Sequence, residues 1–245
     1  YTRHIPPKEI ILSEELENKD FLEEATGARI NTYQKGNKAK LAANAKENAL
    51  ASIERKIAEE ASVKSNLEEL VRIFNLPRIP QRIEVYDNSH IQGSYAIGAM
   101  VVATPDGFDK KQYRTFNIKN PEITNDDFSM MKEVLTRRFN RMTPENKPDV
   151  ILLDGGLGQL HAVHESLKDF DLSGIAVIAI SKGPDRNAGK EFYQMLGRES
   201  FALPFQSPIA FYMQNLRDEA HRFAIGTHRK RRAKSVSKSR LDAVE

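Results

Sequence analysis

Two short apolar runs decide the fold: Arg82-Ile83-Glu84-Val85-Tyr86-Asp87-Asn88-Ser89-His90 and, further along, Asp149-Val150-Ile151-Leu152-Leu153-Asp154-Gly155-Gly156. Each run predicts a strand, and each carries an aspartate, Asp87 or Asp154, at or near the end of that strand. Aspartate is depleted in strands, so these positions require an explanation. If the strands are neighbours, the two carboxylates repel each other unless a cation lies between them. The sequence therefore predicts a divalent-metal site.

The composition is that of an ordinary soluble globular protein. Of 245 residues, 40% are apolar and 29% are charged. No apolar run approaches the roughly 20 residues that span a bilayer. The absence of cysteine excludes disulfides, thiolate zinc sites and cysteine nucleophiles, and it fits a cytoplasmic protein. The net charge is only +3, but residues 228–240 contain seven Lys or Arg and no acid. Because the chain begins at Tyr1, we expect a piece of a longer protein.

Residues 1–80 predict a separate N-terminal α/β segment. A short helix is expected between two short strands at residues 9–12 and 29–33. An Ala/Glu/Lys-rich run then predicts a long helix over residues 37–75, with a break near residues 62–65. No catalytic group of residues is apparent in this segment.

Residues 81–228 predict a second domain, and residues 229–245 a basic tail. The expected elements are strands 83–87, 96–103 and 112–118, helix 127–139, strand 150–154, helix 158–170, strand 175–180, a short hairpin over 192–203, and a long helix from residue 207. Strands joined by hairpins pair antiparallel, whereas strands that follow helices should lie parallel to the first strand. This is the element order of the ribonuclease H fold, a mixed five-stranded α/β sheet flanked by helices. In that fold Asp87 and Asp154 become neighbours, and the last helix can bring His221 to them.

Six runs of the sequence together resemble the C-terminal half of the UvrC family, the incision subunit of bacterial nucleotide excision repair. They are Tyr86-Asp87-Asn88-Ser89-His90 with Gly93, Tyr113-Arg114-Thr115-Phe116-Asn117-Ile118, Asp126-Asp127-Phe128, Arg137-Arg138, Leu153-Asp154-Gly155-Gly156-Leu157-Gly158-Gln159, and Arg217-Asp218-Glu219-Ala220-His221-Arg222-Phe223-Ala224. The resemblance covers residues 5–245. It implies a ribonuclease H-like domain that cuts DNA on the 5′ side of a lesion.

The resemblance also implies which residues act. Carried over by motif, the metal-binding triad is Asp87, Asp154 and His221, and Asp127 is a further catalytic acid.

The chain departs from the family's usual pattern at two positions. Asn88 stands where isoleucine is frequent, and Leu157 stands where lysine is frequent. Neither change removes a metal ligand, although the missing lysine removes a candidate phosphate contact. The family's GIY-YIG nuclease domain, UvrB-binding segment and helix-hairpin-helix module are expected outside this chain.

The candidate ligands suit a phosphodiester hydrolase. The carboxylates of Asp87 and Asp154 are hard oxygen ligands for Mg²⁺ or Mn²⁺, and two such ions about 4 Å apart activate a water and stabilise the leaving oxygen. The imidazole of His221 is a softer donor that favours Mn²⁺. Alternatively it transfers a proton, since its charge changes near neutral pH. The plainer alternatives are that the aspartates cap a turn and a helix, that His221 is structural, and that Asp127 complements the helix dipole.

Candidate phosphate contacts are mostly arginines, because the planar guanidinium matches phosphate oxygens. They are Tyr113, Arg114, Arg137, Arg138, Lys182, Arg186, Arg217, Arg222, Arg229, Lys230, Arg231 and Arg232. The basic run near the C-terminus should add salt-dependent affinity without sequence preference. The alternative is a solvated tail.

We therefore expect a metal-dependent endonuclease that makes the 5′ incision in damaged double-stranded DNA, with Mg²⁺ or Mn²⁺ as cofactor and UvrB as partner. We also expect this fragment to be weak or inactive without UvrB and the DNA-anchoring module. Two alternatives are another ribonuclease H-like nuclease, such as a junction resolvase or hybrid nuclease, and an inactive DNA-binding module of the same fold. The retained Asp87, Asp154 and His221 argue against the inactive module.

Overall fold

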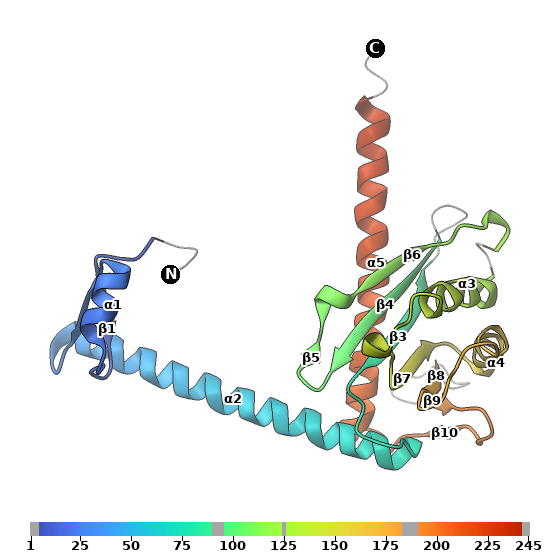
Figure 1. The fold of residues 1–245 in the computed structure, drawn as a ribbon, viewed down its shortest axis with the longest axis horizontal. Coiled ribbons are helices and arrows are strands. Elements are labelled where there is room, and N and C mark those ends of the chain that lie inside the picture. Colours follow the sequence, from blue (N-terminus) through green and yellow to red (C-terminus); the bar gives the residue numbers. More distant parts are fainter. Residues whose placement is uncertain (1–4, 90–95, 124–125, 183–190, 242–245) are drawn as a thin grey trace. The chain divides into compact units, whose positions relative to one another are not determined.

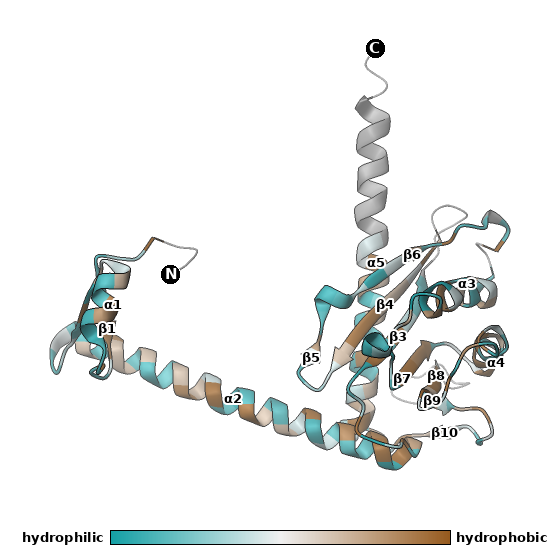
Figure 2. Cartoon of the chain, in the orientation of Figure 1, coloured by the Kyte–Doolittle hydropathy of each residue, from teal (hydrophilic) through white to brown (hydrophobic). Residues whose placement is uncertain are grey.

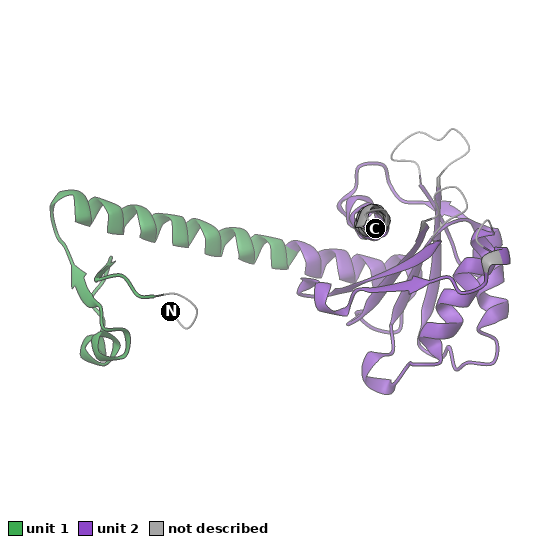
Figure 3. Ribbon diagram, turned by 90° about the horizontal axis from the view of Figure 1, so that it is seen from above, with its two compact units in different colours: residues 1–61 green, residues 62–245 purple. Residues whose placement is uncertain are grey.

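The computed structural model describes residues 5–89, 96–123, 126–182 and 191–241 (Figure 1). The chain divides into two compact units, residues 1–61 and residues 62–245 (Figure 3). This division lies inside the helix α2 (Gly36–Phe74), whereas the sequence suggested a boundary at residue 80. The last turns of α2 belong to the second unit because Leu67, Leu70 and Phe74 are buried in its core.

The expected break in α2 near residues 62–65 is wrong, since the helix runs without interruption. Ser62 and Ser65 are weak helix formers, but they cost a helix only a few tenths of a kcal/mol, compared with about 3 kcal/mol for proline. Burial of the apolar residues in the following turns outweighs so small a cost.

The first unit contains a small two-stranded parallel sheet. Its strands are β1 (Glu9–Leu12) and β2 (Arg29–Thr32), and α1 (Lys19–Thr26) connects them. The chain leaves α1 through Gly27, whose φ of 67° is the left-handed conformation that glycine adopts without strain. The sequence predicted these three elements correctly.

The second unit is built on one mixed sheet. Its strands are β3 (Ile83–Ser89), β4 (Ile97–Thr104), β5 (Gly107–Phe108), β6 (Arg114–Asn117), β7 (Val150–Asp154), β8 (Ala176–Lys182), β9 (Glu191–Gln194) and β10 (Phe201–Ala202). They lie in the order β10-β9-β8-β7-β3-β4-β5, with β6 paired to β4. β3 is antiparallel to β4 and parallel to β7, which confirms the predicted arrangement. The hairpin β9–β10 extends the sheet beyond the five strands that were expected.

Helices cover both faces of this sheet. The helical elements are α3 (Asp127–Phe139), α4 (Leu157–Ser166), α5 (Pro208–Leu241) and the 3-10 turns Lys110–Gln112, Pro121–Ile123 and Pro144–Asn146. The alternation of β3 decides which residue faces which layer: Val85 packs in the core shared with α5 and the end of α2, and Tyr86 in the core beneath α3 and α4. Figure 2 shows the apolar residues concentrated on the central strands. Within the described residues, every helix is too short or too polar to span a membrane.

A buried ion cluster joins β3 to α3. Glu84 has no solvent exposure, and its carboxylate accepts hydrogen bonds from Arg138 Nη2 and Arg82 Nε, each at 2.7 Å. The Tyr86 hydroxyl donates to the same carboxylate at 2.5 Å. A buried carboxylate is tolerated only when paired and hydrogen-bonded, and here two guanidinium groups neutralise it. The cluster therefore fixes the C-terminal half of α3 against the sheet.

Candidate metal centre

Asp87 and Asp154 lie on adjacent parallel strands at the same edge of the sheet. Tyr86 of β3 is in register with Leu153 of β7, so the next residue on each strand is an aspartate. Side chains alternate between the two faces of a strand, so Asp87 and Asp154 point to the same face as the residues that pack under α5. The strand pairing alone therefore brings the two carboxylates together, as the sequence predicted.

α5 supplies the third group. The apolar residues Met213, Leu216 and Ala220 anchor this helix in the core, and His221 follows directly. The Nδ1 atom of His221 lies 2.9 Å from Oδ2 of Asp87. One ligand atom from each of Asp87, Asp154 and His221 can be chosen so that all lie within 4.8 Å of one another. The structure thus brings three of the four predicted catalytic residues into one small cluster.

The electrostatics of this cluster favour a cation. Asp87 is 6% exposed. Burial, and secondly the charge of Asp154, raise the pKa of the Asp87 carboxyl from 3.8 to about 6, although the hydrogen bond and charge of His221 act in the opposite direction. Ionised Asp87 is therefore destabilising in the protein alone. A divalent ion held between the carboxylates would remove that repulsion.

We expect divalent ions to stabilise the chain more at pH 8 than at pH 5. A folded-state pKa of about 6 lies above the unfolded value, so the metal-free protein loses stability as the pH rises from about 4 to about 6, by about 2–3 kcal/mol. Protons compete with the metal below that range. Thermal unfolding with and without Mn²⁺ at both pH values measures the difference. An equal increase in Tm at pH 5 and pH 8, or an unchanged increase in Asp87→Asn, would contradict the assignment.

A polar cleft opens beside the cluster. It has a volume of about 530 Å³ and is lined by Asp87, Asn88, Asp126, Asp127, Phe128, Asp154, Gly155, Gly156 and Gln159. Four of these nine residues are carboxylates, and none is a lysine or arginine. A cleft with this charge attracts cations and would repel a phosphate unless cations were bound.

Asp127, the fourth predicted catalytic residue, lies in this cleft but outside the three-residue cluster. Its neighbour Asp126 is the residue that caps α3, because its carboxylate accepts hydrogen bonds from the backbone N–H groups of Phe128 and Ser129. The capping role therefore belongs to Asp126, and Asp127 stands in the first turn, where the plainer alternative of complementing the helix dipole also places it. Asp127 is exposed in the first turn of α3.

Three of the predicted phosphate contacts are buried or largely buried and have acidic partners inside the protein, so each has a structural role. Tyr113 is buried and its hydroxyl donates to Glu219 at 2.8 Å. Arg138 is held in the Glu84 cluster described above. The Arg217 side chain is only 15% exposed, and it pairs with Glu191 and Asp218. The internal contacts of these side chains position α3 and α5.

The remaining predicted contacts differ in position. Arg114 and Arg222 are exposed, and Arg137 is partly exposed. Arg186 and the side chains of Lys182, Arg229, Lys230, Arg231 and Arg232 lie outside what the structure describes, although the backbone of the last four belongs to α5.

Sequence reasoning missed Glu191. This buried carboxylate accepts from Arg217 at 2.6 Å and from Gln214 at 2.7 Å, and so ties α5 to β9. In the sequence, Glu191 is an acid beside a predicted hairpin. Acids are common at exposed positions, so the sequence did not indicate that this one is buried.

Comparison with known proteins gives the family. The model described as "UvrC RNAse H endonuclease domain" matches residues 71–225, and the one described as "UvrC Ribonuclease H-like domain" matches residues 1–56. UvrABC system protein C of Zymomonas mobilis is 48% identical over all of this chain, and that of Ruegeria pomeroyi is 46% identical. The chain spans 39% and 41% of the length of these two relatives. The catalytic domain of human Endonuclease V aligns with 76% of this chain and 98% of its own, at 16% identity and a TM-score of 0.40.

The stretch that matches the endonuclease model also contains the site. The matched endonuclease model contains β3, β7 and the part of α5 that bears His221. With a family model over most of the chain and close relatives along its full length, the protein belongs to the UvrC family.

Proposed function

We propose that this chain is the region of a nucleotide excision repair nuclease that hydrolyses one DNA strand on the 5′ side of a lesion, using divalent metal ions. The observation that carries the proposal is the convergence of Asp87, Asp154 and His221 within 4.8 Å, inside the stretch that matches the endonuclease model. The damaged duplex and UvrB are the proposed partners, and a DNA substrate would place the protein in the cytoplasm.

The donor set fits Mg²⁺ or Mn²⁺. Asp87 and Asp154 would hold the metal through carboxylate oxygens, and His221 would complete the ligand set, with a preference for Mn²⁺. When bound, such ions supply an activated water and stabilise the leaving oxygen of the phosphodiester. Asp127 faces the same cleft and would orient that water by accepting a hydrogen bond. Without the metal, the negative charge of the aspartates in this cleft would repel the phosphate of the substrate, so the reaction would depend on the metal.

Exposed arginines near the sheet would hold the DNA strand. Arg222 follows His221 on α5, and its side chain is 64% exposed although it pairs with Glu219, so a phosphate can reach it beside the cluster. The basic run of α5 beyond residue 228 would add salt-dependent affinity without reading sequence. Lesion recognition would come from the partners.

Mapping of the cut tests this proposal. A lesion-containing duplex, labelled at either end and loaded with UvrB, is incubated with the full-length protein carrying this region. We expect Mg²⁺- or Mn²⁺-dependent cleavage on the 5′ side, which EDTA abolishes. A 5′ cut that persists in EDTA would disprove the metal dependence. Faster cleavage of an RNA–DNA hybrid or a four-way junction than of the damaged duplex would favour the alternative nucleases.

A further inference from the structure

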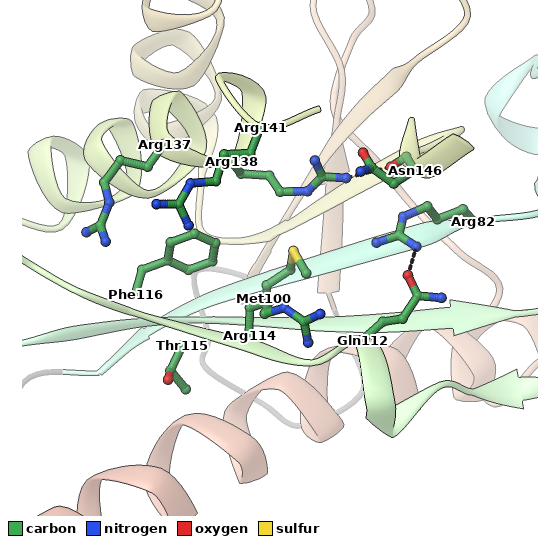
Figure 4. A pocket seen from close by; sticks show the side chains of 10 residues that line it. All are labelled: Arg82, Met100, Gln112, Arg114, Thr115, Phe116, Arg137, Arg138, Arg141 and Asn146. Carbon is green, nitrogen blue, oxygen red and sulfur yellow. Dashed lines mark hydrogen bonds between the residues drawn. The ribbon is translucent and has the colours of Figure 1, made fainter. Parts of the chain in front are cut away.

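A second pocket lies at the C-terminal half of α3, whereas the metal cleft lies at the start of that helix. It has a volume of about 230 Å³ and is lined by Arg82, Met100, Gln112, Arg114, Thr115, Phe116, Arg137, Arg138, Arg141 and Asn146 (Figure 4). Five of its ten lining residues are arginines, and none is acidic. The pocket is thus the electrostatic opposite of the metal cleft.

Packing keeps the arginines of this pocket in place. Arg82 and Arg138 share the buried Glu84, and Arg82 also donates to Gln112 Oε1. Arg137 pairs with Glu133 at 3.0 Å and lies over the ring of Phe116, with 5.7 Å between Cζ and the ring centroid. These side chains therefore form a preorganised wall.

The described residues do not balance the charge of the pocket. Glu84 and Glu133 are the carboxylates that pair with its arginines, so five guanidinium groups face two acids. Arg114 is exposed and donates only to the carbonyl oxygens of Lys111 and Tyr113 among the described residues. Arg141 is also exposed and forms no ion pair with any side chain that the structure describes. Like charges brought this close repel one another unless an anion lies between them.

We propose that this pocket binds one phosphate group. The guanidinium groups that line this pocket come from β6, α3 and the residues that flank α3 and β3. Such a set suits a tetrahedral anion, whose oxygens accept hydrogen bonds from different directions. Gln112, Thr115 and Asn146 add neutral polar groups to the lining. The volume is several times the roughly 30 Å³ that a water molecule occupies, which is enough for a phosphate but not for a base pair.

The pocket is a separate site from the metal centre. Arg82 directly precedes β3, and Asp87 lies five residues later on that strand. In extended backbone the two positions are about 17 Å apart and their side chains point to opposite sides of the sheet. If the phosphate belongs to the DNA backbone, the pocket anchors the substrate at a distance from the cut. This reading rests on the proposed function. If the phosphate is a free anion, it does not.

The experiment measures binding by the 245-residue chain in EDTA, so that no cleavage occurs. The variants are Arg114→Ala, Arg141→Ala and their double, because both side chains are exposed and can be removed without disturbing the Glu84 cluster. Arg55→Ala removes the same charge from an exposed position on α2 and is the matched control. The probes are a 20-base-pair duplex by fluorescence anisotropy across a salt series, and inorganic pyrophosphate by calorimetry.

For the duplex, we expect the double variant to bind about tenfold more weakly at low salt and Arg55→Ala to bind as the parent does. The slope of log K against log salt should fall in magnitude by about 1 for the double variant, because both arginines share one phosphate. If the double variant binds pyrophosphate more weakly than the parent does but binds the duplex equally well, the ligand is a free anion. A slope change near 2 would indicate two independent surface charges and overturn the pocket, as would unchanged binding of both probes.

Failure of this inference and failure of the proposed function are distinguishable. The binding assay contains no metal and scores no cleavage, so an inactive metal centre leaves its outcome unchanged. Conversely, loss of cleavage in Asp87→Asn says nothing of the arginine pocket.

Discussion

Replacing Asp87 or Asp154 by asparagine should lower the rate of 5′ incision by about 10³-fold or more, equivalent to about 4 kcal/mol of transition-state stabilisation. Asparagine keeps the size of the side chain but removes the negative charge that would hold the cation. The ligand atoms of Asp87, Asp154 and His221 lie within 4.8 Å, so one missing charge affects the whole cluster. Single-turnover cleavage of a lesion-containing duplex by full-length protein measures the effect.

Two comparisons separate this effect from misfolding. Asp171→Asn changes an exposed aspartate that pairs with Lys147 outside the cleft, and should cleave at the parent rate. Asp87→Asn should be at least as stable as the parent at pH 8 without metal, because burial and Asp154 raise the pKa of Asp87 to about 6. Incision by Asp87→Asn within a few-fold of the parent rate would disprove the catalytic assignment.

Replacing Glu84 by glutamine should destabilise the second unit by about 3–5 kcal/mol. The substitution preserves the shape of the side chain but leaves Arg138, whose side chain is 8% exposed, without its counter-charge. The Tyr86 hydroxyl would also lose a charged acceptor. Urea unfolding of the chain measures the change.

Glu133→Gln is the matched control for this substitution. It also removes an arginine partner on α3, but the pair with Arg137 is partly exposed, so a loss below about 1 kcal/mol is expected. Equal destabilisation by the two substitutions would show that burial of Glu84 does not set the energy of the cluster.

Local patterns predicted the parts of the fold that depend on neighbouring residues. The sequence predicted a helix over residues 127–139, and the structure gives the same residues, Asp127–Phe139, with Asp126 as its cap. The adjacency of Asp87 and Asp154 follows from the rule that strands separated by helices lie parallel. His221 required the family resemblance, because the rotation of a helix over a sheet depends on packing that no local pattern encodes.

The parts that sequence reasoning did not predict depend on contacts between distant residues. The ion pair of Arg138 was not predicted, since nothing near it in sequence shows that Glu84, 54 positions earlier, is its partner. The signal was Glu84 itself, an acid at a core-facing position of a strand, which requires a buried partner. The boundary at residue 80 was placed at a proline-rich run, whereas Leu67, Leu70 and Phe74 pack with the second unit through long-range apolar contacts.

The most direct test of the metal centre is a crystal of this chain soaked in Mn²⁺ and examined by anomalous scattering. The account predicts a peak about 2.0–2.2 Å from an oxygen of Asp87 and an oxygen of Asp154, with a ring nitrogen of His221 in the same coordination sphere. No peak at millimolar Mn²⁺, or a peak that contacts neither aspartate, would contradict it.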